Sequence, residues 1–156
     1  MRQHRHHFEL RTEADAPFVQ LLREWPPGFG GVERVAHGVS TELLAPVVSL
    51  RLPAAVNRDP LSVAYSRKSL LSLAFGRVYI PLPSLQLWRL LWQRQPLLAH
   101  LPCPTVLLLV MLARLLRPHR RITIYWHAFV RPRSGLAGRL ESLYLYMALK
   151  SMRSSQ

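Results

Sequence analysis

The chain has 156 residues, of which 49% are hydrophobic, and it carries 21 basic against 8 acidic residues, for a formal net charge of +13. This length leaves no room for two full domains, since independent domains cluster at ~100 to 150 residues, and the composition excludes a disordered chain. The single cysteine, Cys103, excludes an intramolecular disulfide and favours a reducing, cytoplasmic setting in which the thiol is a small buried residue.

The basic residues are unevenly placed along the chain. No acidic residue occurs between Pro60 and Leu140, whereas arginines recur throughout that stretch. A segment of this kind attracts anions. Its compatible partners are phosphorylated small molecules, an anionic membrane surface, a nucleic acid or an acidic protein.

The N-terminus is polar and rich in histidine. His4, His6 and His7 are clustered there, and no apolar run of the kind a signal peptide needs is present. These histidines would hold a metal only if further ligands converged on them, so we expect no metal site. We predict that residues 1–16 form a flexible leader and that residues 17–156 form one folded domain.

Strand and helix patterns alternate through the rest of the chain. Apolar runs and turn signals predict strands at 18–22, 46–52, 62–65, 77–81, 97–101 and 122–126, and the spacing of apolar residues predicts helices at 32–43, 85–94, 105–116 and 136–152. This alternation predicts an α/β fold, a single Rossmann-like domain with a mainly parallel sheet flanked by helices, and ligands at the carboxyl ends of the strands. The most apolar run, 106–113, is too short to span a membrane.

The segment Trp-Pro-Pro-Gly-Phe-Gly-Gly-Val-Glu-Arg at 25–34 joins the first strand to the first helix. Gly30 and Gly31 let a ligand approach the backbone, and the helix that follows offers unpaired N–H groups to a phosphate. The segment matches neither Gly-x-Gly-x-x-Gly nor a Walker sequence. On these grounds alone, a plain turn is as compatible with it as a phosphate site.

Three landmarks resemble the N-terminal domain of family-4 glycosyltransferases of the GT-B fold. The glycine segment after a first strand resembles the loop that opens that family. His100-Leu-Pro-Cys-Pro104 before an apolar helix resembles its strand ending in histidine and proline, and the strand that ends at His127 resembles its strand ending in Trp-His. The landmarks occur in the family's order and cover most of the chain from about Phe18 to Lys150.

The resemblance implies the roles of individual residues. Gly30 and Gly31 would meet the donor diphosphate, and His127 would be the catalytic residue near the transferred sugar. His100 and Pro104 would line the acceptor side of the cleft. The donor would be a nucleotide-sugar, with no further cofactor and no metal.

The chain also departs from the family pattern. Gln95-Pro96 stands where an acidic residue is common, and Pro102 stands where a second histidine is frequent. The C-terminal donor-binding domain of the family is absent from the sequence. We therefore expect either a separately encoded C-terminal domain or a truncated, inactive enzyme.

The segment 85–94 adds a membrane hypothesis. Trp88 and Trp92 fall on its apolar side, and Arg89 and Arg94 could contact an anionic membrane surface at the cytoplasmic inner face. We favour the other interpretation, a helix packed on the sheet with both tryptophans turned to the core.

The leading hypothesis is that the chain forms the acceptor-side domain of an enzyme for hexosyl transfer from a nucleotide-sugar to a lipid-linked or saccharide acceptor, incomplete as a single chain and peripheral on the membrane. A basic nucleic-acid-binding module is the first alternative, although no helix-turn-helix, zinc spacing or aromatic RNA platform is present. A membrane-surface module without enzymatic activity is the second alternative.

Overall fold

The computed structural model describes residues 16–24, 30–51, 62–75, 78–127 and 135–153. Its elements, in chain order, are β1 (Val19–Leu22), α1 (Gly31–Leu43), β2 (Val47–Arg51), β3 (Arg67–Phe75), β4 (Val78–Pro81), α2 (Leu85–Trp92), β5 (Leu97–Leu101), α3 (Pro104–Leu116), β6 (Ile122–Trp126) and α4 (Gly135–Arg153). The leader predicted at 1–16 lies outside the described residues except for Ala16, which is buried.

The strands form a six-stranded sheet in the order β4-β3-β2-β1-β5-β6. All neighbouring pairs are parallel except β3 and β4, which form an antiparallel hairpin. The predicted α/β, Rossmann-like fold is thereby confirmed. Strand order reverses between β1 and β5, and open sheets of this class bind ligands at the carboxyl ends of the strands at such a point.

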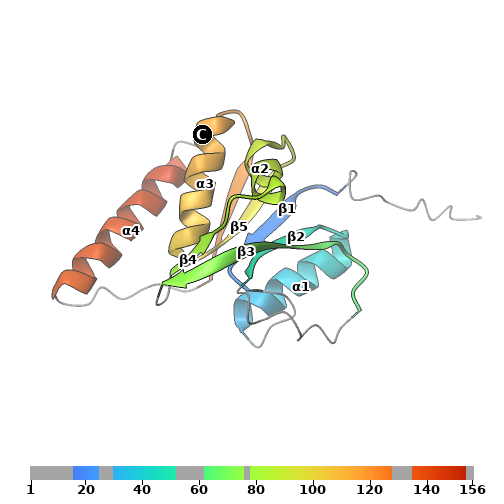
Figure 1. The fold of residues 1–156 in the computed structure, drawn as a ribbon, viewed down its shortest axis with the longest axis horizontal. Helices are drawn as coiled ribbons and strands as arrows, with labels where there is room; N and C mark the ends of the chain where they lie inside the picture. The colour runs from blue at the N-terminus through green and yellow to red at the C-terminus, as the bar shows by residue number, and fades with distance from the viewer. Residues whose placement is uncertain (1–15, 25–29, 52–61, 76–77, 128–134, 154–156) are drawn as a thin grey trace, which may run out of the picture.

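The helices cover the two faces of the sheet unequally. α1 lies on one face, while α2, α3 and α4 lie on the other (Figure 1). The larger core fills the second face, where Leu21, Leu50 and Leu101 pack against α3 and buried residues of α2. Side chains alternate along each strand, so the residues next to these on the strands point toward α1.

One strand prediction was wrong. Residues 62–65 are not a strand, and β3 begins only at Arg67. The strand begins with the polar residues Arg67, Lys68 and Ser69, so it lacks the apolar run that predicts the start of a strand. Parallel pairing with β2, in which Leu50 lies opposite Leu70, supplies the stabilisation that the local pattern does not indicate.

The tryptophans of α2 also differ from expectation. Trp88 and Trp92 are 55% and 42% exposed, and their rings stack on each other at 5.2 Å between centroids. Leu90 and Leu91 are the buried residues of the helix. The expectation that both indoles face the core is therefore wrong, because α2 turns its leucines toward α3 and β3.

Within the described part of the chain, no helix combines the length and the apolar character that crossing a bilayer requires.

Candidate functional site

A chain of hydrogen-bonded side chains connects three parallel strands and leads to the carboxyl edge of the sheet. Gln20 comes from β1, His100 from the neighbouring β5, and His127 follows directly on β6. Their strand neighbours Leu21, Leu101 and Trp126 pack in the core on the far face. The polar chain therefore lies on the α1 face of the sheet.

Each link of this chain is short. Gln20 Nε2 lies 3.0 Å from the carbonyl oxygen of Ala36 and 2.6 Å from Ser40 Oγ, both in α1. Gln20 Oε1 lies 2.7 Å from His100 Nε2, and His100 Nδ1 lies 2.8 Å from His127 Nε2. We call the chain Ser40-Gln20-His100-His127 the histidine relay.

The donors and acceptors of the relay follow from its inner end. A carbonyl oxygen only accepts, so the group of Gln20 that faces Ala36 has to be the amide NH2, and Oε1 has to face His100. His100 therefore donates from Nε2 and, as a neutral ring, accepts at Nδ1. His127 in turn donates from Nε2 to His100, which fixes the orientation of its ring.

Burial keeps the relay neutral. His100 is only 2% exposed, and burial together with the nearby His127 lowers its pKa to about 4. Burial also lowers the pKa of His127, against an opposing effect of the Glu33 carboxylate. A neutral His127 that donates from Nε2 presents its Nδ1 as an acceptor, and no hydrogen bond from the described residues occupies that nitrogen.

The N-terminus of α1 lies beside the relay. Gly30 is the N-cap residue and Gly31 the first residue of the helix. A Cβ at Gly30 would collide with the Glu33 carboxylate, which folds back over this position, whereas a Cβ at Gly31 would meet open space. Glu33 is 8% exposed and acts electrostatically on His127, so an acid and a histidine meet at this helix end.

The structure thus brings most of the residues singled out in the sequence to one edge. His100 and His127 are in direct contact, and Gly30 and Gly31 open α1 at the same carboxyl edge. The other glycine-segment residues, 25–29, lie outside the described residues.

The remaining singled-out residues lie elsewhere. Pro104 is the exposed first residue of α3, on the other side of the sheet from the relay. Arg89 is exposed on α2, and Arg94 follows the end of that helix, next to the amino end of β5. The structure therefore does not place Pro104, Arg89 or Arg94 with the histidines.

Sequence reasoning missed Gln20, Ser40 and Glu33. Gln20 carried a usable signal, since it is a polar residue inside the apolar strand Val-Gln-Leu-Leu, and buried polar groups need partners. Ser40 and Glu33 carried none beyond their place in a helix, because their contacts depend on how α1 docks on β1.

Metal coordination finds no support among the described residues, since no three His, Cys, Asp or Glu side chains converge. Cys103 is buried at the start of α3, and burial raises the pKa of its thiol, which keeps it protonated. The described side chains of the relay are hydrogen-bond donors and acceptors.

Comparisons with known proteins give no further assignment. No protein-family model matches the chain, and neither a curated protein nor a solved structure matches it. The function has to be argued from the chemistry of the relay and of the helix end beside it.

Proposed function

We propose that the chain forms the acceptor-side domain of a nucleotide-sugar-dependent glycosyltransferase, with the relay and the α1 N-terminus facing the reacting groups. The observation that carries the proposal is the relay itself, a buried polar chain that ends in His127 beside a glycine-capped helix end. It lies at the carboxyl edge of the strands, on the side of β1 where strand order reverses. The base of the nucleotide is left to a second domain.

His127 has a defined task in this scheme. Its Nε2–H is held by His100, so the neutral ring accepts a hydrogen bond at Nδ1 from a hydroxyl of the sugar. The lowered pKa keeps the ring in that accepting form at neutral pH. The relay therefore orients the sugar, and no covalent step is assigned to His127.

The α1 N-terminus supplies the electrostatic part. Negative charge develops on the diphosphate as it leaves, and the N–H groups of a first helical turn stabilise such charge. Glu33 occupies the space next to Gly30, so the diphosphate would approach from the open side at Gly31.

An exposed apolar surface supports a lipid-linked acceptor. The β3–β4 register places alternate residues of the hairpin on its α1 side, where each is at least 40% exposed. We call this surface the hairpin patch; its members are Leu71, Leu73, Phe75, Val78 and Ile80. A contiguous apolar patch suits contact with lipid or another apolar partner.

Several arginines are engaged within the fold, which argues against a nucleic-acid surface. Arg23 stacks on the ring of Tyr79 at 4.6 Å, and Arg117 stacks on Trp92 at 4.5 Å. Arg120 is 5% exposed and donates to backbone carbonyls. Binding along a nucleic-acid backbone needs a run of exposed cations, and these three side chains are buried or only partly exposed.

The proposal is tested by calorimetric titration with nucleoside diphosphates and their sugars, comparing the wild-type chain with Gly31→Pro. Proline is tolerated at the first position of a helix, and Gly30 has the extended backbone, φ −84° and ψ 163°, that a following proline requires. The substitution removes one N–H group and keeps the helix. We expect binding by the wild-type chain and at least ~10-fold weaker binding by the variant.

Gly38→Ala is the matched control, since Gly38 lies in the same helix and a Cβ there meets open space. It should bind as the wild type does. Absence of binding at millimolar ligand, or equal binding by Gly31→Pro, would contradict the assignment of the helix end.

The lipid acceptor has its own test, pelleting with uncharged phosphatidylcholine vesicles. Leu73→Ser should reduce pelleting because it removes an exposed apolar side chain from the hairpin patch, whereas Leu115→Ser, at an exposed position of α3, should not. Equal loss in both variants, or none in either, would leave a soluble saccharide as the better acceptor.

A further inference from the structure

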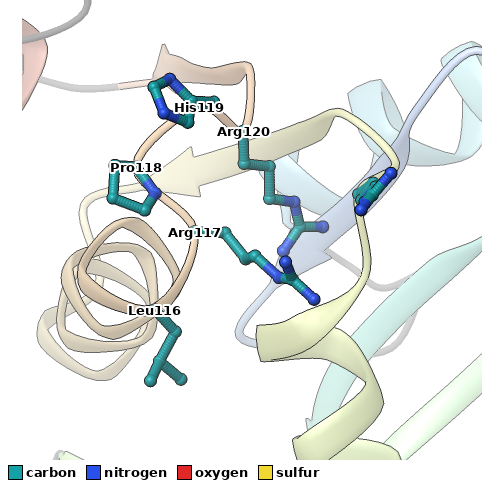
Figure 2. A pocket seen from close by; sticks show the side chains of 6 residues that line it. Leu116, Arg117, Pro118, His119 and Arg120 are labelled. Carbon is teal, nitrogen blue, oxygen red and sulfur yellow. The ribbon is translucent and has the colours of Figure 1, made fainter.

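A cavity lies at the opposite edge of the sheet from the relay. It has a volume of about 380 Å³ and opens where α2 leads into β5 and α3 leads into β6 (Figure 2). Its lining residues are Arg94, Leu116, Arg117, Pro118, His119 and Arg120. Since parallel strands begin at this edge, the cavity is remote from the site around His127, which follows the carboxyl end of β6.

Arg120 is the unusual residue of this cavity. It is 5% exposed, and its Nε and Nη1 donate to the carbonyl oxygens of Gln95 and Leu90 at 2.7 and 2.6 Å. Its Nη2 is buried and has no hydrogen-bond partner among the described residues. Burial lowers the pKa of Arg120 to about 10, so the group stays charged at neutral pH.

Arg117 is held next to it. Its guanidinium lies over the ring of Trp92 at 4.5 Å, and its Nε donates to the carbonyl oxygen of Trp92 at 3.0 Å. Figure 2 shows the guanidinium groups of Arg117 and Arg120 brought close together on the same side of the cavity. Within the described residues no carboxylate forms an ion pair with either of them, the ion pair there being Arg23 with Glu24.

Two adjacent cations, one of them almost fully buried with an unused donor, are unfavourable without a counter-charge. We propose that this cavity is an anion site that binds a phosphate group, as inorganic phosphate or as a phosphate monoester. Arg117, Arg120 and Arg94 provide donors in the forked geometry that matches phosphate oxygens. The site is independent of the proposed glycosyltransferase function, because it uses none of the residues of the relay or of the α1 N-terminus.

The test is a titration of the intact chain with inorganic phosphate against sodium chloride of matched ionic strength. The indole N–H resonance of Trp92, whose ring lies under Arg117, reports locally on the cavity. We expect saturable shifts of this resonance with phosphate and none with chloride. Arg94→Gln and Arg117→Gln should each weaken binding at least ~10-fold, since each removes a charged donor.

Arg89→Gln is the matched control, since Arg89 is exposed on α2 and does not line the cavity. It removes the same charge and should bind phosphate as the wild type does. Arg120→Gln is less informative, because Arg120 also donates to two backbone carbonyls and its loss would destabilise the fold. Equal weakening by Arg89→Gln and Arg94→Gln would overturn the site in favour of general charge attraction.

Two further arms identify the source of the phosphate group. Vesicles of phosphatidylcholine with phosphatidic acid that bind the wild-type chain, release it on addition of phosphate and fail to bind Arg94→Gln would assign a lipid headgroup. Binding of inorganic phosphate without vesicle binding would assign a soluble ligand.

The alternative outcome is that a carboxylate of the chain itself, rather than an external anion, neutralises these arginines. If phosphate bound the triple variant Glu9→Gln, Glu13→Gln, Asp15→Asn but not the wild-type chain, the proposal of an external anion would fail. It would fail equally if phosphate bound neither protein.

Discussion

At the scale of single residues, the amide of Gln20 decides the state of two histidines. Both of its NH2 hydrogens are used by α1, so its oxygen can only accept from His100. His100 therefore carries its ring proton on Nε2, and His127 has to donate from its own Nε2 to His100 Nδ1. The docking of α1 on the sheet therefore determines which ring nitrogen of His127 carries the proton.

The buried His100 makes stability depend on pH. Its pKa of about 4 in the folded chain lies below the usual value of 6.5. Between these two pH values, the unfolded chain binds a proton that the folded chain does not bind. His100 does not reduce the free energy of unfolding above about pH 6.5. As the pH drops from there toward about 4, the free energy of unfolding falls by about 1.4 kcal/mol per pH unit. The lowered pKa of His127 acts in the same direction.

Urea denaturation at several pH values in this window measures the slope. His100→Asn should flatten it, because the variant removes the buried imidazole. An unchanged slope in His100→Asn would show that other groups set the acid sensitivity.

Gln20→Leu tests the relay as a structural unit. The variant removes the two hydrogen bonds that the Gln20 amide donates to α1, and it leaves the Nε2–H of the buried His100 without an acceptor. The free energy of unfolding should therefore fall by about 2 kcal/mol. Ring-nitrogen NMR should also show that His127 loses its single tautomer. Gln86→Leu, at an exposed position of α2, should change neither quantity, and retention of one tautomer in Gln20→Leu would contradict the derived chain of donors.

At the scale of elements, the sequence of a helix rich in apolar residues does not indicate which of its faces is buried. In α2, six of the eight positions from Leu85 to Trp92 are apolar, so two different faces satisfy the same spacing. The indoles stay exposed because α3 and β3 accept the leucines. α3 has the same property, with one face in the core and another exposed at Leu108, Met111, Leu112 and Leu115.

Two leucines of α3 give a matched pair for this point. Leu107 is 2% exposed and Leu115 is 75% exposed. Leu107→Ala should reduce the free energy of unfolding by about 2 to 5 kcal/mol through a cavity in the core, and Leu115→Ala by less than about 0.5 kcal/mol. Thermal and urea denaturation compare them, and similar losses would mean that the exposed face of α3 is covered in solution.

At the scale of the whole molecule, the sheet separates the two proposed anion sites. One lies at the carboxyl edge with Gly31 and His127, the other at the amino edge with Arg94 and Arg120. A five-residue strand such as β5 spans about 16 Å, which exceeds the range over which substitutions usually couple.

We therefore expect the two sites to behave independently. Gly31→Pro should weaken nucleoside diphosphate binding and leave the phosphate response of Trp92 intact, and Arg94→Gln should do the reverse. Calorimetry and NMR on the double variant should show the sum of the single effects. Loss of both ligands in either single variant would mean that one site accounts for all anion binding.

Much of the fold followed from local pattern. The alternation of strands and helices, the end of β5 at His100 and Leu101, and the start of α1 at the glycines were readable because periodicity and capping act over a few residues. The start of β3 at Arg67 was not readable, because its pairing with β2 rather than its own side chains holds it in place.

The sequence by itself determined the class of the fold and placed His100 and His127 at strand ends beside a glycine-opened helix. Only the tertiary structure decided that Gln20 reaches His100 across 80 residues, that His100 reaches His127 across 27, and that Arg120 is buried with an Nη2 that has no hydrogen-bond partner among the described residues. The physical reason is that element types depend on the nearest neighbours along the chain, whereas strand order and helix docking depend on the burial of surfaces that meet only after folding.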